Sequence, residues 1–212
     1  MNEVTNSGII QTGGHMRIEG SAIGDNAAVR PGDVARDRPR PAEPPSAMTG
    51  VRIFLNYRNE DEPFGAALVD HELSARFGSA RVFRASKSIS LGEDFADAIL
   101  SAVRRSTALL VLIGPRWLKA ADSRGIRRLD DPDDWVRQEI AEALRHGVRV
   151  IPILLNTDLP RPGDLPEDIA QLVRGQYLRI HHRNSRRDIR RLIDELAELL
   201  PELTTESQQP DH

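Results

Sequence analysis

Residues 107–113 read Thr-Ala-Leu-Leu-Val-Leu-Ile (TALLVLI), and Gly114-Pro115 follows them directly. A continuous apolar run of this length, ended by glycine and proline, is typical of a parallel strand that is buried on both faces of its sheet. An amphipathic helix is predicted before it, over residues 93–105, and another after it, over residues 134–146. The centre of the chain therefore alternates strand and helix.

The same alternation extends in both directions. Further strands are predicted at residues 51–56, 81–83, 148–154 and 177–180, and further helices at residues 63–77 and 186–200. Five strands with helical connections predict an α/β fold, and right-handed crossovers favour a flavodoxin-like three-layer sandwich with a five-stranded parallel sheet in the order 2-1-3-4-5. Residues 57–62, 84–92 and 114–135 then lie at the carboxyl edge of the sheet, where such folds bind ligands.

The composition narrows the possible classes of protein and site. The chain has 212 residues, a net charge of −3 and no cysteine, which excludes disulfides, thiolate metal sites and cysteine nucleophiles. It also lacks the GxxxxGK[ST], GxGxxG, GxSxG and HExxH motifs, and we expect no metal and no cofactor. No apolar run reaches the ~18–20 residues of a membrane span, and no signal peptide is recognised, so we expect a soluble cytoplasmic protein.

The first 50 residues differ from the rest of the chain, because all nine aromatic residues come after them. Residues 1–29 hold short β-prone pieces separated by glycine. Within them, residues 7–29 are either a disordered tail or a segment that stacks in register with other copies as a cross-β assembly. The proline-rich and charged residues 30–50 predict an extended, disordered linker. A globular domain is predicted over residues 51–203, followed by a disordered tail over residues 204–212.

The helix predicted after the central strand carries the most informative side chains. Asp133 or Asp134 is expected to cap it. Its inward face is expected to consist of Val136, Ile140, Ala143 and Leu144. Glu142 is expected on the surface, paired with Arg145 or His146.

Trp135 and Glu139 are four residues apart, so they share one face of this helix near the ligand edge of the sheet. An indole beside a carboxylate suits a flat cationic ring that is attached to sugar hydroxyls. Taken alone the pair is a weak signal, because a glutamate on a helix surface is usually only solvated.

The arginines near the end of the chain do not indicate nucleic-acid binding. Arg190 and Asp194 are four residues apart, as are Arg191 and Glu195, so the last helix is expected to carry a salt-bridged, solvated face. The near-neutral net charge also gives no general attraction to a polyanion.

Four segments in succession resemble the Toll/interleukin-1 receptor (TIR) domain family. They read RIFLNYRNED, RVFRASKSISLGEDF, TALLVLIGPRW and DDWVRQEIAEALRHGVRVIPILL. The resemblance covers about residues 50–200 and is to the bacterial, NAD-cleaving immune type. Tyr57-Arg58 matches the aromatic–arginine pair after the first strand of the family, and Trp135 and Glu139 match its tryptophan and catalytic glutamate.

The resemblance implies an NAD glycohydrolase in which Glu139 is catalytic and Tyr57, Arg58 and Trp135 bind the substrate NAD. It also implies self-association through the loop after the second strand. The residues of that loop are Arg84, Ala85, Ser86, Lys87, Ser88 and Gly92. The loop departs from many receptor and adaptor members of the family because it contains no proline.

Two other interpretations of the function stay open. The first is a non-catalytic TIR module that recruits other TIR proteins, and the second is an enzyme that acts on nucleic acid or another nucleotide. The presence of Glu139 favours an enzyme over the module, because scaffolding members of the family commonly lack a glutamate there. Hydrolysis and cyclisation of NAD are equally compatible with the sequence.

Overall fold

The computed structural model describes residues 52–84 and 95–205. The chain divides into two units, Met1–Ser46 and Ala47–His212, and every described residue belongs to the second. The predictions for residues 1–50, including the stacking segment and the linker, therefore lie outside the described residues. So do most of the predicted self-association loop and residues 206–212 of the predicted tail.

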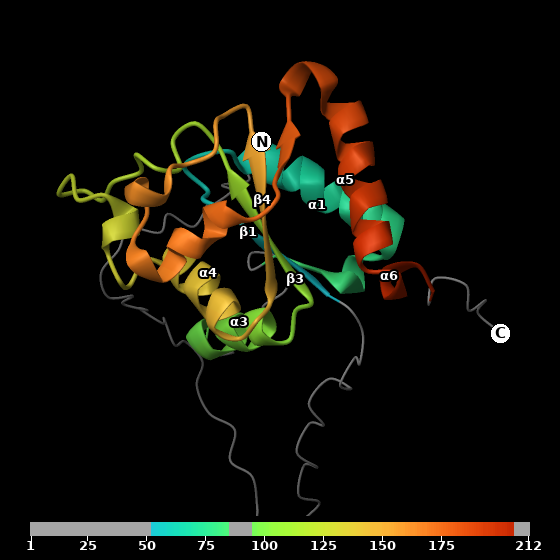
Figure 1. Cartoon of the computed structure of the whole chain (residues 1–212), viewed down its shortest axis with the longest axis horizontal. Helices are drawn as coiled ribbons and strands as arrows, with labels where there is room; N and C mark the ends of the chain where they lie inside the picture. Colours follow the sequence, from blue (N-terminus) through green and yellow to red (C-terminus); the bar gives the residue numbers. More distant parts are fainter. Residues whose placement is uncertain (1–51, 85–94, 206–212) are drawn as a thin grey trace, which may run out of the picture. The chain divides into compact units, whose positions relative to one another are not determined.

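The described residues contain a five-stranded parallel sheet with the order β2-β1-β3-β4-β5, as predicted (Figure 1). The strands are β1 (Ile53–Asn56), β2 (Val82–Phe83), β3 (Ala108–Ile113), β4 (Arg149–Leu155) and β5 (Leu178–Ile180). β3 lies at the centre, and its six residues are all buried. The apolar run that decides the fold is thus the middle strand of the sheet.

Helices cover both faces of the sheet and complete a three-layer sandwich (Figure 1). One face carries α1 (Pro63–Phe77), α5 (Ser185–Leu199) and α6 (Glu202–Thr205), and the other carries α3 (Phe95–Arg104) and α4 (Trp135–Arg145). Short 3₁₀ helices lie in the connections: η1 (Ser79–Arg81), η2 (Arg128–Asp130), η3 (Pro162–Asp164), η4 (Glu167–Arg174) and η5 (His182–Asn184).

Side chains of β1 alternate between two apolar cores. Ile53 and Leu55 belong to the α1–α5 cluster, which fills the space under α1, α5 and α6. Phe54 belongs to the α3–α4 cluster on the opposite face. Asn56 follows at the same spacing, so its polar side chain points toward the α4 side of the sheet, where it is fully buried.

The connection between β4 and β5 contains helical structure, although the sequence predicts neither a helix nor a strand between residues 154 and 177. It contains η3 and η4, and Ile169 and Leu172 of η4 are buried against the α3–α4 cluster. Their spacing of three residues fits a 3₁₀ helix, in which side chains at i and i+3 eclipse. The prolines at residues 160, 162 and 166 hide this short repeat in the sequence.

Both edge strands of the sheet are short, with two residues in β2 and three in β5. At its amino end, β4 extends beyond the residues that pair with β5, and this unpaired part carries Pro152. The N–H of Arg149 points toward β3 and that of Asn156 toward β5. Since N–H groups alternate along a strand, the missing N–H of Pro152 falls on the β5 side. Pairing with β5 begins only at Ile153, so the proline removes no bond from the sheet.

The sequence predicts Glu142 on the surface, but in the structure it is only 2% exposed. Its pairing is as expected: Arg145 Nη2 lies 2.6 Å from Oε2, and His146 Nδ1 lies 3.5 Å from Oε1. The burial arises because Arg104 of α3 also contacts the carboxylate. The periodicity of α4 alone does not show a partner on another helix, which is why the exposure was predicted wrongly.

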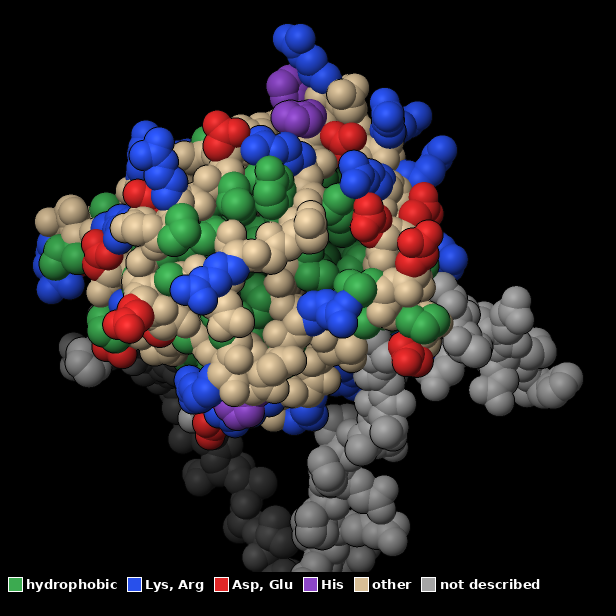
Figure 2. Space-filling view, viewed as in Figure 1, with side chains coloured by type: hydrophobic (Ala, Val, Ile, Leu, Met, Phe, Trp, Pro, Cys, Tyr) green, Lys and Arg blue, Asp and Glu red, His purple; other side chains and the backbone are tan. Residues whose placement is uncertain are grey.

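The face in Figure 2 carries hydrophobic side chains gathered toward the middle, with basic side chains among them and both basic and acidic side chains around the margin. On α5, Arg191 pairs with Glu195 at 3.2 Å, as predicted.

Among the residues described, no helix combines the length and the apolar character that crossing a membrane requires.

The turn after β1 is fastened to the end of β3. The Asp61 carboxylate accepts the backbone N–H groups of Gly114 and Arg116, each at 2.7 Å. A Cβ at Gly114 would lie 2.5 Å from Cγ of Glu62 and 2.6 Å from Oδ2 of Asp61, so a side chain does not fit there. Glycine at this position lets the two loops at the carboxyl edge meet.

Substituting Gly114→Ala is expected to lower the free energy of unfolding by about 1–3 kcal/mol, because the methyl group forces the Asp61 turn away from β3. Gly163→Ala is the matched control, since a Cβ there meets nothing within 4 Å, and its effect should stay below about 1 kcal/mol. Urea denaturation of both variants measures the difference, and equal stabilities would contradict the steric argument.

Candidate functional site

The site begins at the carboxyl end of β1, where the first turns of α4 approach the sheet. Asn56 Nδ2 donates a hydrogen bond of 2.7 Å to Glu139 Oε2 and another of 3.1 Å to the Val136 carbonyl. Both bonds are buried and join residues about eighty positions apart in the sequence. One amide group therefore fixes the last residue of β1 to the beginning of α4.

A second link lies beside the first. Arg58 donates two hydrogen bonds of 2.8 Å to the two carboxylate oxygens of Asp134, and both side chains are only 5% exposed. Asp134 is also the N-cap of α4, because its side chain accepts the backbone N–H of Arg137 at 3.1 Å. The prediction of a capping aspartate is confirmed, and the cap has a second function as the partner of an arginine.

Glu139 is the most unusual ionisable group of this region. It is 7% exposed, and burial raises the pKa of its carboxyl group from 4.5 to about 8. The hydrogen bond from Asn56 and the charge of Arg58 act in the opposite direction, while the charge of Asp134 raises the pKa further. Burial outweighs the hydrogen bond, so the carboxyl group holds its proton at neutral pH.

In the part of the chain that the structure describes, two buried polar atoms of the residues that join β1 to α4 have no hydrogen-bond partner: the acceptor Oδ1 of Asn56 and the donor Nε of Arg58. An unsatisfied buried polar group costs about 1–3 kcal/mol, and such groups are uncommon. An acceptor and a donor that both lack partners next to a buried carboxyl group are suited to a ligand with hydroxyl and anionic oxygen atoms.

The structure brings some of the predicted site residues together and separates others. Glu139 and Arg58 both lie where β1 meets α4, and Trp135 is the half-buried first residue of α4. Tyr57 is half-buried and packs against the α1–α5 cluster, on the other face of the sheet from Glu139. The substrate-binding roles of these residues stay predictions.

Only the first residue of the predicted self-association loop lies within the described residues. Arg84 is half-buried, and its Nε lies 3.3 Å from Oδ2 of Asp70 on α1. Ala85, Ser86, Lys87, Ser88 and Gly92 lie outside the described residues.

Sequence reasoning missed Asn56 and the partnership of Arg58 with Asp134. A signal for Asn56 was present, because a polar residue that ends an otherwise apolar strand marks the carboxyl edge of a parallel sheet. The pairing of Arg58 joins residues 76 positions apart and needs the fold to be known. In residues 52–84 and 95–205, the histidine, aspartate and glutamate side chains form no group of three or more that could hold a metal ion.

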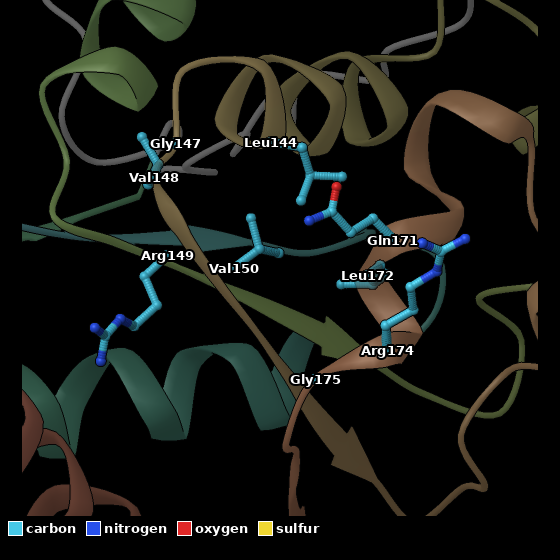
Figure 3. Close-up of a pocket in the computed structure, with 9 residues that line it drawn as sticks. All are labelled: Leu144, Gly147, Val148, Arg149, Val150, Gln171, Leu172, Arg174 and Gly175. Carbon is cyan, nitrogen blue, oxygen red and sulfur yellow. The ribbon is translucent and has the colours of Figure 1, made fainter.

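A pocket of about 410 Å³ lies at the opposite end of α4 and contains none of the residues above. Figure 3 shows Leu144 of α4, Val150 of β4 and Leu172 of η4 around it, with Arg149 directed away from the others. It is at the amino end of β4, whereas ligands of parallel α/β sheets bind at the carboxyl ends of the strands. The candidate functional site is therefore the contact between β1 and α4, and not this pocket.

The raised pKa of Glu139 makes folding depend on pH. Between pH 4.5 and about 8 the folded chain keeps the proton while the unfolded chain releases it, so the stability from this group is complete below pH 4.5 and is lost as the pH rises to about 8. In Glu139→Gln the carboxamide oxygen still accepts the Asn56 hydrogen bond. We expect this variant to exceed the wild type in free energy of unfolding by about 4–5 kcal/mol at pH 8.5, with the difference falling below about 1 kcal/mol at pH 5.

Chemical denaturation of both proteins at a series of pH values measures this difference. A difference that stays constant from pH 5 to pH 8.5 would show that the Glu139 carboxyl group ionises normally in the folded chain.

Known proteins similar to this chain carry the same fold. The curated zebrafish (Danio rerio) protein NAD(+) hydrolase SARM1 is 23% identical over 159 residues, which are 75% of this chain and 21% of the relative. The chain thus spans about a fifth of that relative's length. A solved structure of the TIR domains of the activated Roq1 resistosome covers 69% of this chain and 99% of the matched chain, with 13% identity and a TM-score of 0.52.

The family comparison covers most of the described domain. Residues 53–193, well over half of the chain, match the family model described as the TIR domain. This range runs from the first residue of β1 into α5 and includes both β1 and α4. The chain therefore belongs to the TIR domain family.

Proposed function

We propose that this chain is an NAD glycohydrolase, which breaks the bond between nicotinamide and the ribose of NAD and gives ADP-ribose or a cyclic form of it. The observation that carries the proposal is the buried carboxyl group of Glu139, held at the carboxyl edge of the sheet by Asn56 and close to Arg58. The name of the zebrafish relative, an NAD(+) hydrolase, supports it.

Cleavage of the bond between nicotinamide and ribose needs one carboxylate from the protein. Nicotinamide is a pyridinium cation in NAD, and it departs as a neutral molecule with the electron pair of the broken C–N bond. Glycoside cleavage usually needs a second carboxyl group as a general acid, and this leaving group removes that need. What remains is to stabilise the positive charge that develops on the ribose, and the carboxylate of Glu139 supplies the opposite charge. Water then forms the new bond to the same ribose carbon and loses a proton, which gives ADP-ribose; in cyclisation another nucleophilic atom of the same molecule forms that bond.

The charge state of Glu139 is compatible with a site that binds a cation. In the unliganded chain burial keeps the carboxyl group protonated at neutral pH. A pyridinium ring beside it favours the ionised form and lowers the pKa again. Substrate binding thus generates the carboxylate at the moment when it is needed, and the proton is released to solvent.

The neighbouring residues supply binding groups in this proposal. Trp135, one turn before Glu139 on α4, offers a flat surface to the nicotinamide ring. Arg58 keeps Nε available for the diphosphate, while its two terminal nitrogens bind Asp134. Tyr57 packs on the α1–α5 side of the sheet. In this proposal it contacts the substrate at the carboxyl edge of the sheet, because it directly follows the last residue of β1.

Self-assembly belongs to the same proposal. The loop that begins at Arg84 is proposed to join neighbouring copies, and residues 7–29 are proposed to raise the local concentration of TIR domains by stacking. The Roq1 relative is described as part of an activated resistosome, which supports a role for assembly in signalling and immune defence.

The catalytic role of Glu139 is tested by measuring nicotinamide release and identifying the products by mass, with concentrated full-length protein. Glu139→Gln is expected to reduce turnover by about 10²-fold or more, because the neutral carboxamide cannot balance the charge on the ribose. Glu195→Gln makes the same chemical change at an exposed position on the other side of the sheet and should leave turnover unchanged.

A chain that releases no nicotinamide at any concentration, with or without Glu139, would be a non-catalytic TIR interaction module. Products other than nicotinamide and an ADP-ribose would indicate an enzyme for a different nucleotide.

The role of the amino-terminal segment is tested by deleting residues 1–45. Activity should fall at dilute concentration, because the tethered copies are lost, and should return when the TIR domains are crowded artificially. The measurement is nicotinamide release per protein over a range of concentrations. Equal activity of both chains throughout that range would remove the segment from the mechanism.

A further inference from the structure

We infer that Asn56 is a positioning residue of this site, which holds the carboxyl group of Glu139 in place for reaction through its side-chain amide. The inference rests on the proposed function and names a residue that neither the family resemblance nor the sequence analysis assigns. It starts from the two buried hydrogen bonds of Asn56 Nδ2, at 2.7 Å to Glu139 Oε2 and 3.1 Å to the Val136 carbonyl.

The orientation of the Asn56 amide follows from its partners. A backbone carbonyl only accepts hydrogen bonds, so the group that faces Val136 has to be the NH₂. The same NH₂ therefore points its second N–H at Glu139, whichever protonation state Glu139 has. Asn56 is 0% exposed and is the last residue of β1, so it reaches Glu139 from the rigid sheet and not from a loop.

The oxygen of the same amide gives a second, independent observation. Asn56 Oδ1 is buried and has no partner among the described residues, although a buried acceptor normally has one. Amide geometry places it no more than about 5 Å from Glu139 Oε2, because the two atoms are joined through Nδ2. Glu139 and Oδ1 are thus two neighbouring acceptors, and the vicinal hydroxyl groups of a ribose are a matching pair of donors.

The surrounding charges explain why the amide matters for Glu139. Asp134 opposes ionisation of Glu139, while Arg58 and the hydrogen bond from Asn56 favour it. Of these, the hydrogen bond is the largest effect that opposes burial. Without Asn56 the carboxylate would lose its orienting donor, and its pKa would rise further.

The test compares Asn56→Ala and Asn56→Asp with the control Asn59→Ala, which changes an exposed asparagine in the same turn. Asn56→Asp keeps the shape of the side chain but replaces the amide donor with a second acidic group, which opposes ionisation of Glu139 while the packing stays the same. Both Asn56 variants are expected to lower kcat for nicotinamide release by about 10-fold or more with a smaller change in KM, and the control to match the wild type.

A second measurement does not depend on turnover. The Glu139 carboxyl group is titrated by ¹³C NMR in the wild type, Asn56→Ala and Asn59→Ala. The midpoint should move upward by about one pH unit in Asn56→Ala only, and the pH profile of kcat should move with it. Circular dichroism of each variant establishes that it is folded.

The outcomes separate the inference from the proposed function. Wild-type kcat, pH profile and Glu139 midpoint in the folded Asn56 variants would overturn the role of Asn56 and leave the glycohydrolase intact. An inactive wild type would overturn the glycohydrolase, and the Glu139 midpoint would then decide by itself whether Asn56 holds the carboxyl group.

Discussion

The site depends on one joint, in which polar side chains at the end of β1 bind the first turns of α4. Asn56 reaches Glu139 and the Val136 carbonyl, and Arg58 reaches the capping residue Asp134. Most of the α3–α4 face is apolar, and well-packed apolar side chains would cost less free energy to bury here than charged ones. Polar groups at such a cost specify one position for α4 on the sheet, and they place its ionisable residues at the edge where parallel sheets bind ligands.

The joint treats its two carboxyl groups differently although they are five positions apart. Asp134 meets a guanidinium group through two hydrogen bonds, so its charge is balanced within the chain. Within residues 52–84 and 95–205, the Glu139 carboxyl group is hydrogen-bonded only to the amide of Asn56, and burial keeps it protonated at neutral pH. Enzymes give separate roles to chemically similar residues by placing them in different surroundings, as here. Here the Asp134 carboxylate holds the structure together, and Glu139 is the group to which the proposed function assigns the cationic substrate.

Most of the fold was predictable from the sequence, because each strand or helix shows in the local pattern. The apolar runs of β3 and β4, the helix after Pro63 and the capping aspartate of α4 all depend on neighbours within a few positions. The contacts that define the site link residues 76 to 83 positions apart, and no local periodicity records them. The burial of Glu142 was missed for the same reason, since its partner Arg104 belongs to another helix. The 3₁₀ helix η4 was missed because its two buried residues are too few to stand out among prolines.

The short strands at the two margins of the sheet restrict how copies of this domain can join. β2 has two residues and β5 has three, and Pro152 leaves a gap in the donors of β4 beside β5. A margin with so few free peptide groups is a poor template for a strand from another chain. If copies of this domain associate, we therefore expect them to meet through helices and loops and not by pairing of their sheets edge to edge.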